Sequence, residues 1–519
     1  MRRRPALALL GAAALWVPLI LRWSQSWLSA PDQAFGWFVP VFAIYLGIER
    51  WRRGRAPAEP TAGERTGGAV AFALGCLLVF TNLPVLEANA LWPTAQWWGA
   101  AGATLATLGA FTAAGGWLWA RQFLFPPLFI FTALTWPTPI KTWIVGTLEG
   151  ANAEIAAGVV SSFGHPAVVS GNVIAVSTGM VGIEEACSGL RSLQTVWMMA
   201  WFAGEFFLLN LPRRFFLVFA AVLVALVANL GRTIFLTWVA ADQGLLASER
   251  WHDRAGNLEL AVDLILVAAL AWRAHRPGGR RRTVSAFGPL PVRAPGQFDG
   301  VWKRWQALAV AALAVGLVAE AGTRAWYHSH SRGDVARVHW RLTRPNPNWT
   351  AVPVPPREIE VLQSTQADGL RVRPPGSEFP AWVFVVSWEG SAARSENPEW
   401  HDPTICLPAA GGRLIGTLGT APLQIGPQAL SFAGYRFQVG GQAETVYFCH
   451  WDAENATVRQ EEASGSAGDV RSRRWQRVRE GRRQGDVAHI AFVIETADAA
   501  AALAWLQHWA PLLLQPVSG

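Results

Sequence analysis

The sequence predicts a polytopic, all-α transmembrane bundle of about eight helices, then a ninth tethering helix and a C-terminal α+β soluble domain. Of the 519 residues, 51% are hydrophobic and only 15% are charged, whereas ordinary soluble domains carry roughly 25% charged residues. The long apolar runs all lie within residues 1–325, and the rest of the chain resembles a soluble domain. These two observations exclude a disordered chain, a collagen-like chain and a single soluble enzyme.

Nine stretches are apolar over about the 20 residues that a helix needs to cross a bilayer. They lie near residues 5–22, 34–48, 67–86, 95–119, 122–140, 188–209, 214–240, 256–272 and 305–322. The second is short, and the fifth contains Pro126 and Pro127. The first also has the basic start and apolar core of a signal peptide, but no small-residue cleavage site follows it, which favours a retained helix.

The arginines predict the orientation, because basic residues gather in cytoplasmic loops. Arginines 2–4 put the N-terminus inside, and the clusters at 50–55, 213–214 and 273–282 mark later inner loops. Loops 23–33, 87–94, 141–187 and 241–255 then face outward, together with everything after residue 322. The expected location is the inner (plasma) membrane, with the C-terminal domain in the periplasm.

The net charge of +8 does not predict nucleic-acid binding, because the basic residues lie mostly in short connectors rather than on one face. Four parts are expected: a membrane domain over 1–275, a basic cytoplasmic linker over 276–304, a tethering helix over 305–322 and an extracytoplasmic domain over 323–519. In the last part, β-branched and aromatic runs predict strands, and an apolar run predicts a closing helix that ends before Pro511. The predicted strands are 382–388, 435–439, 445–451 and 488–494, and the predicted helix is 499–509.

Three residues with chemical potential fall at the same predicted boundary. Cys187 lies at the outer start of the sixth span, Arg232 in the outer half of the seventh, and His252 in the outer loop before the eighth. A thiolate is a nucleophile, an imidazole transfers protons near neutral pH, and a guanidinium stabilises an oxyanion or holds a carboxylate. Together they indicate acyl transfer through a covalent thioacyl intermediate.

The residues around Cys187 in the sequence have opposing effects on the pKa of its thiol. A helix start and Arg191 one turn later lower a thiol pKa, whereas Glu184 and Glu185 oppose this unless they pair with arginine. Each candidate also has a structural interpretation: a packing cysteine, an arginine extended toward the membrane surface, and a solvated loop histidine. His165 is the second choice of base.

The run from Glu185 to Ser192, followed by Asn229-x-x-Arg232 and then His252, resembles the exosortase/archaeosortase family of membrane cysteine transpeptidases. The resemblance covers roughly residues 1–275, and residues 32–40 are similar to an early outer-loop motif of the family. It implies an enzyme that recognises C-terminal signals of the PEP-CTERM kind and passes the acyl group to an acceptor. It assigns Cys187 as nucleophile, His252 as acid/base and Arg232 as third catalytic group, with Glu185, Arg191 and Asn229 in support.

The motif from His401 to Pro408 resembles the short signature of an exosortase-associated domain that some members carry at their C-terminus. His401 and Cys406 are therefore candidate residues of an accessory site. A disulfide between Cys406 and Cys449, a reactive Cys406 and a metal site are the alternatives for this region.

The predicted function is a membrane cysteine protease/transpeptidase that acts on C-terminally anchored secreted proteins in the lipid bilayer, with an unknown acceptor nucleophile. No cofactor, metal or nucleic-acid partner is expected. The alternative is a transporter or exopolysaccharide-assembly component without protease activity, in which Arg232 and acidic residues such as Glu205 and Asp263 line a pathway.

Overall fold

The computed structural model describes most of the chain in two compact units. One consists of residues 1–167 and 176–329, and the other of residues 168–175 and 330–519. Outside the description are residues 1–3, 30, 172, 183–188, 276–298, 331–336, 344–348, 355–358, 360–361, 363, 390–402, 410–411, 440, 454–456, 460–466, 484 and 519.

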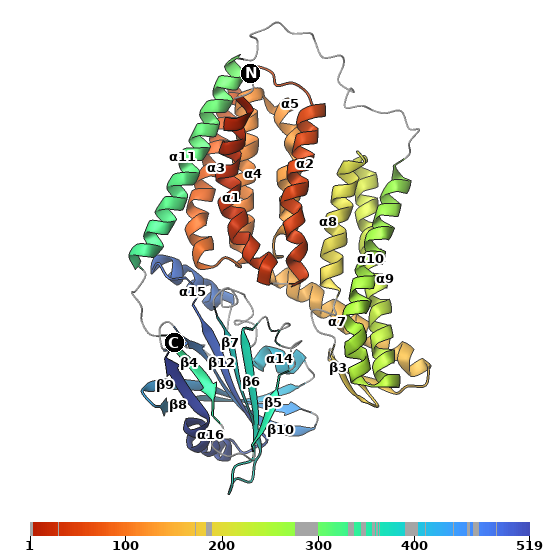
Figure 1. Ribbon diagram of the computed structural model, residues 1–519, viewed down its shortest axis with the longest axis vertical. Helices are drawn as coiled ribbons and strands as arrows, with labels where there is room; N and C mark the ends of the chain where they lie inside the picture. Colours follow the sequence, from red (N-terminus) through yellow and green to blue (C-terminus); the bar gives the residue numbers. More distant parts are fainter. Residues whose placement is uncertain are drawn as a thin grey trace. The chain divides into compact units, whose positions relative to one another are not determined.

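The first unit contains a group of long helices that pack through small residues (Figure 1). The group consists of α1 (Arg4–Ser29), α3 (Ala62–Ala88), α4 (Pro93–Gly115) and α11 (Asp299–His330). A Cβ added to Gly11 of α1 would lie 2.7 Å from the backbone of Ala309 on α11. Such close backbone approach is typical of helix packing in membranes. The predicted ninth helix is therefore packed against the first, within the membrane unit.

A second group comprises α8 (Leu190–Phe206), α9 (Leu211–Gln243) and α10 (Leu245–Ala274), which contact one another pairwise. Gly244 joins α9 to α10 with φ of +91°, a conformation that glycine adopts without strain. This single-residue turn makes α9 and α10 antiparallel. Apolar residues such as Val196, Ala225 and Val267 fill the space between the three helices.

The other elements of this unit are mostly short. They are η1 (Pro31–Trp37), α2 (Phe38–Arg53), α5 (Trp117–Ala120), η2 (Arg121–Phe123), α6 (Phe125–Phe129), η3 (Ile130–Ala133), α7 (Thr138–Ser162) and the strand β3 (Gly179–Gly182). The strands β1 (Ala167–Ser170) and β2 (Val173–Val176), which pair in the order β1-β2-β3, lie mostly in residues 168–175 of the second unit. The predicted single span over 122–140 is wrong. This stretch is broken into η2, α6, η3 and the start of α7, with Pro126 at the start of α6 and Pro137 before α7, where an N–H donor is not needed.

Four helices in the described part of the chain are long and apolar enough to cross a membrane: α3, α9, α10 and the Gly300–His330 part of α11. They coincide with four of the nine predicted spans. The predicted spans over 34–48, 95–119 and 188–209 coincide with α2, α4 and α8, which do not reach this standard. The predicted span over 5–22 coincides with α1, part of which lies outside the described residues. The chain is thus a mostly helical membrane protein, and the count of eight bundle helices is not confirmed.

The second unit is built on an antiparallel sheet with the order β5-β6-β7-β12-β10-β9-β8. The strands are β5 (Thr350–Pro353), β6 (Gln366–Val372), β7 (Ala381–Trp388), β8 (Arg413–Ile425), β9 (Gln428–Val439), β10 (Gln442–Asp452) and β12 (Val487–Ile494), with β11 (Thr457–Arg459) beside β10 and a separate pair of β4 (Val338–Leu342) and β13 (Leu514–Ser518). All four predicted strands are confirmed within β7, β9, β10 and β12.

Helices cover both faces of this sheet. Trp505 and Leu506 of α16 (Ala499–Leu513) pack on one face with Cys449 and Phe492, whereas Leu407 of α14 (Pro403–Ala409) packs on the other with Val446. The unit also contains α15 (Ala467–Arg479). The predicted closing helix is confirmed as α16, but it continues through Pro511 to Leu513, so its predicted end was wrong.

Candidate active site

Arg232 and His252 meet between α9 and α10. Arg232 Nη2 lies 2.9 Å from His252 Nε2, and the two side chains are only 10% and 12% exposed. A guanidinium has donors but no acceptor, so Nε2 accepts this hydrogen bond and the imidazole proton lies on Nδ1. Nδ1 in turn donates to Asp253 Oδ1 at 3.1 Å. His252 is therefore held as a neutral ring with its basic nitrogen facing a fixed cation.

Glu259 lies on the other side of Arg232. Its Oε2 is 3.4 Å from Arg232 Nη1, and its Oε1 accepts a 2.8 Å hydrogen bond from the hydroxyl of Ser192 on α8. Glu259 is 7% exposed. Because it bonds to Arg232 of α9 and to Ser192 of α8, it links all three helices of the group.

The entry to α8 is shaped by Gly189 and Asn229. Gly189 has φ of +81°, and a Cβ there would lie 2.6 Å from Cγ of Asn229. Any larger side chain would therefore be strained in its backbone and would collide with α9. Asn229 is one turn before Arg232 on α9, so Gly189 at the start of α8 lies against the same part of α9 as Arg232.

Buried hydrogen-bonding atoms remain without a partner here. Among the residues that the structure describes, Arg232 Nε and Asn229 Oδ1 have none, although both are shielded from solvent. Most buried polar groups are paired, so such exceptions are expected where a substrate or a reacting group completes the bonding. Within the described part of the chain, these two atoms are a donor and an acceptor that a bound substrate could pair with.

Two of the predicted residues fall outside the description. Cys187 and Glu185 lie within the gap at 183–188, so the structure does not test the nucleophile. Arg191, in the first turn of α8, is exposed, while Asn229, Arg232 and His252 are brought together as described. Arg232 contacts His252 and not the alternative base His165.

Sequence reasoning missed Glu259. It follows His252 by seven residues, and with Gly256 and Asp263 it forms a stripe at positions i, i+4, i+7 and i+11 of α10. Such spacing puts all four residues on one face of a helix. Gly256 leaves room for the guanidinium on this face, since a Cβ there would lie 3.1 Å from Arg232 Nη2.

The two acidic residues proposed for a transport pathway have different environments. Glu205 at the end of α8 is paired with Arg50 and Arg214, so its charge is compensated. Asp263 is fully buried, and neither of its carboxylate oxygens has a hydrogen-bond partner among the described residues.

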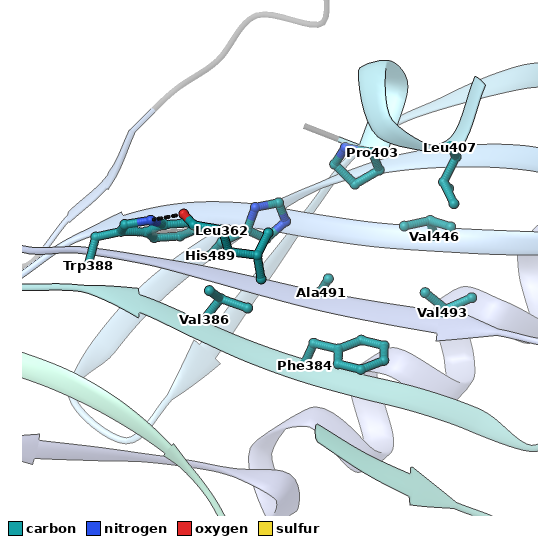
Figure 2. A pocket seen from close by; sticks show the side chains of 10 residues that line it. All are labelled: Leu362, Phe384, Val386, Trp388, Pro403, Leu407, Val446, His489, Ala491 and Val493. Carbon is teal, nitrogen blue, oxygen red and sulfur yellow. Dashed lines mark hydrogen bonds between the residues drawn. The ribbon is translucent and has the colours of Figure 1, made fainter. Parts of the chain in front are cut away.

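The accessory candidates His401 and Cys406 belong to the other unit and are barely described. His401 is outside the description, and of Cys406 only the position within α14 is described. Pro403 and Leu407 of α14 line an apolar cavity of about 210 Å³ together with His489 of β12, as Figure 2 shows. Cys449 packs with α16 on the opposite face of the sheet.

The fold and the cluster define a polytopic membrane protein with a buried arginine–histidine–glutamate arrangement between three helices. Residues 27–272 match the model of the transmembrane exosortase family (Exosortase_EpsH). The family consists of cysteine-type proteases/transpeptidases that act in the membrane on secreted proteins. The curated proteins and the solved structures gave no significant match to the chain.

Proposed function

We propose that the chain is a cysteine transpeptidase that removes C-terminal sorting signals of the PEP-CTERM kind from secreted proteins at the outer face of the inner membrane. The observation that supports this best is the buried pair of Arg232 and His252. Gly189, which rests against Asn229, follows Cys187 by two residues in the sequence. This place in the sequence is our reason for proposing Cys187 as the nucleophile.

The proposed reaction begins with transfer of the Cys187 thiol proton to Nε2 of His252, the nitrogen that carries no proton. The thiolate adds to the scissile carbonyl carbon, and the resulting oxyanion accepts a hydrogen bond from Arg232, whose Nε has no acceptor among the described residues. His252 then returns the proton to the leaving amine as the C–N bond breaks. The thioester that remains on Cys187 is attacked by the acceptor nucleophile, which restores the thiol.

The test is processing of a co-produced secreted protein that ends in a PEP-CTERM signal. Cys187→Ala is expected to abolish processing at unchanged expression, and Cys76→Ala, which removes a buried thiol of α3, is the matched control. Intact processing by the Cys187→Ala variant would overturn the proposed function.

One observation favours the alternative of a transporter or polysaccharide-assembly component, namely the buried and unpartnered carboxyl of Asp263. A pathway residue of this kind is needed for transport but not for thioester chemistry. An inert Cys187 thiol together with loss of function in Asp263→Asn would favour the alternative.

A further inference from the structure

Arg232 donates to two acceptors, and protonation of His252 removes only one of them. Its Nη2 is bonded to the neutral nitrogen of His252, at 2.9 Å, and its Nη1 is 3.4 Å from the carboxylate of Glu259. The first bond exists only while His252 Nε2 is unprotonated, whereas the carboxylate accepts in either state of the imidazole.

Protonation of His252 would place two cations in direct contact. Two like charges a few ångströms apart in a partly buried site repel by several kcal/mol, and Nε2–H can no longer accept a hydrogen bond. Arg232 must then turn to another acceptor. Glu259 is fixed for this purpose, because Ser192 already holds its other oxygen at 2.8 Å.

Among the described residues, the other charges near the pair do not replace Glu259. Asp253 bonds to His252 from the solvent side, where its side chain is 92% exposed, so water screens its charge. Arg191 of α8 acts on Glu259 but is itself a cation. Asp263 lies one turn deeper on α10 and has no hydrogen bond to Arg232.

We infer that Glu259 is a positioning residue that receives Arg232 whenever His252 takes up the thiol proton. Glu259 thereby keeps the guanidinium placed to bind the oxyanion. Its negative charge offsets the repulsion between the guanidinium and the imidazolium. This inference rests on the proposed function, since it needs His252 to act as the base.

The experiment is the pH dependence of processing of a PEP-CTERM-tagged secreted protein by the full-length enzyme in membranes. Glu259→Gln is expected to slow processing about 10–100-fold. It is also expected to move the acid limb of the pH–rate profile down by about one unit, because the loss of a negative charge disfavours the imidazolium. Glu259→Asp, which keeps the charge, should return the limb to its wild-type position.

Asp263→Asn is the matched control, since it neutralises a buried carboxyl on the same face of α10 that does not bond to Arg232. It should leave both the rate and the acid limb unchanged. A wild-type profile in Glu259→Gln, or a slower rate with an unmoved limb, would overturn the inference and leave Glu259 a packing residue.

Two further variants keep the test decisive. If Glu259→Gln does not accumulate, Ser192→Ala keeps the charge but frees the carboxylate, and it should slow processing less than Cys187→Ala while the limb stays in place. An unmoved rate in Ser192→Ala would then contradict the inference. Normal processing by Cys187→Ala, measured in parallel, would instead contradict the proposed function.

Discussion

Arg22 and Arg232 are both largely buried arginines that bind side chains of other helices in the membrane unit, yet their partners differ. Arg22 is bonded to Glu87 at 2.8 Å, to Glu320 at 2.9 Å and to the Pro18 carbonyl, so carboxylates surround it. Arg232 has one carboxylate at a longer distance, an imidazole, and an Nε without a partner among the described residues. The first arrangement is saturated and suits a structural link, whereas the second is incomplete and suits a reacting group.

The largest expected effect is a loss of stability when the ion-paired cluster around Arg22 is broken. Arg22→Leu leaves Glu87 and Glu320 without their cation, and removing one partner of a buried ion pair costs about 3–5 kcal/mol. Thermal unfolding in detergent should show this loss, with processing per folded molecule retained. Arg53→Leu, at an arginine that is 64% exposed, is the control and should change stability by less than about 1 kcal/mol. Equal losses in both variants would remove the distinction.

The second prediction concerns a substitution in the incomplete cluster around Arg232. Arg232→Lys keeps the charge but not the planar fork that reaches His252 and Glu259 together. Processing is expected to fall about 10²–10³-fold, as when one oxyanion donor is removed. The unfolding temperature should change little. A variant that loses stability but keeps its rate would assign Arg232 the same role as Arg22.

The third prediction concerns the glycine at the start of α8. Gly189→Ala combines a backbone at φ of +81° with a Cβ that would lie 2.6 Å from Asn229, so a destabilisation of about 1–3 kcal/mol and slower processing are expected. Gly231→Ala is the matched control, because no atom lies within 4 Å of its added Cβ. That variant should be neutral or slightly stabilising, since alanine favours helices.

The smallest effect is expected at Glu444, a partly buried carboxyl in the C-terminal unit. Burial, and secondarily Glu495, raise the pKa of Glu444. A carboxyl with a raised folded-state pKa contributes its full stability below the unfolded pKa and loses it as pH rises through the folded value. Glu444→Gln should therefore raise the unfolding temperature of this unit slightly at pH 7, and the difference should shrink at pH 4. A difference that grows on acidification would contradict this sign.

The sequence predicts helices from apolar length, and it succeeds where that length is unbroken, as in α3, α9, α10 and α11. It fails over 122–140, where the mean apolarity hides the local effect of Pro126 and Pro127. It also misses α7 within the predicted loop 141–187. That helix buries one narrow face, including Ala153, Ala156 and Val160, against the rest of the unit, so no long apolar run marks it.

The candidate site was predictable where residue type signals chemistry, as for Arg232 and His252. Glu259 was missed because a single acidic residue in a helix has many interpretations until a partner helix defines which face it occupies. The spacing of His252, Gly256 and Glu259 was a usable signal. The contact between Gly189 and Asn229 could not be predicted from the sequence, because it depends on how closely α8 approaches α9.

The most direct test of the central claim, that Arg232 and His252 activate the thiol of Cys187, is the pH dependence of Cys187 alkylation by iodoacetamide, measured by peptide mass spectrometry. In the wild-type enzyme the midpoint should lie well below the ordinary thiol pKa of about 8.5, and His252→Ala or Arg232→Lys should return it to that range. The buried Cys76 should stay unreactive throughout. A wild-type midpoint at the ordinary thiol value, unchanged in both variants, would contradict the account.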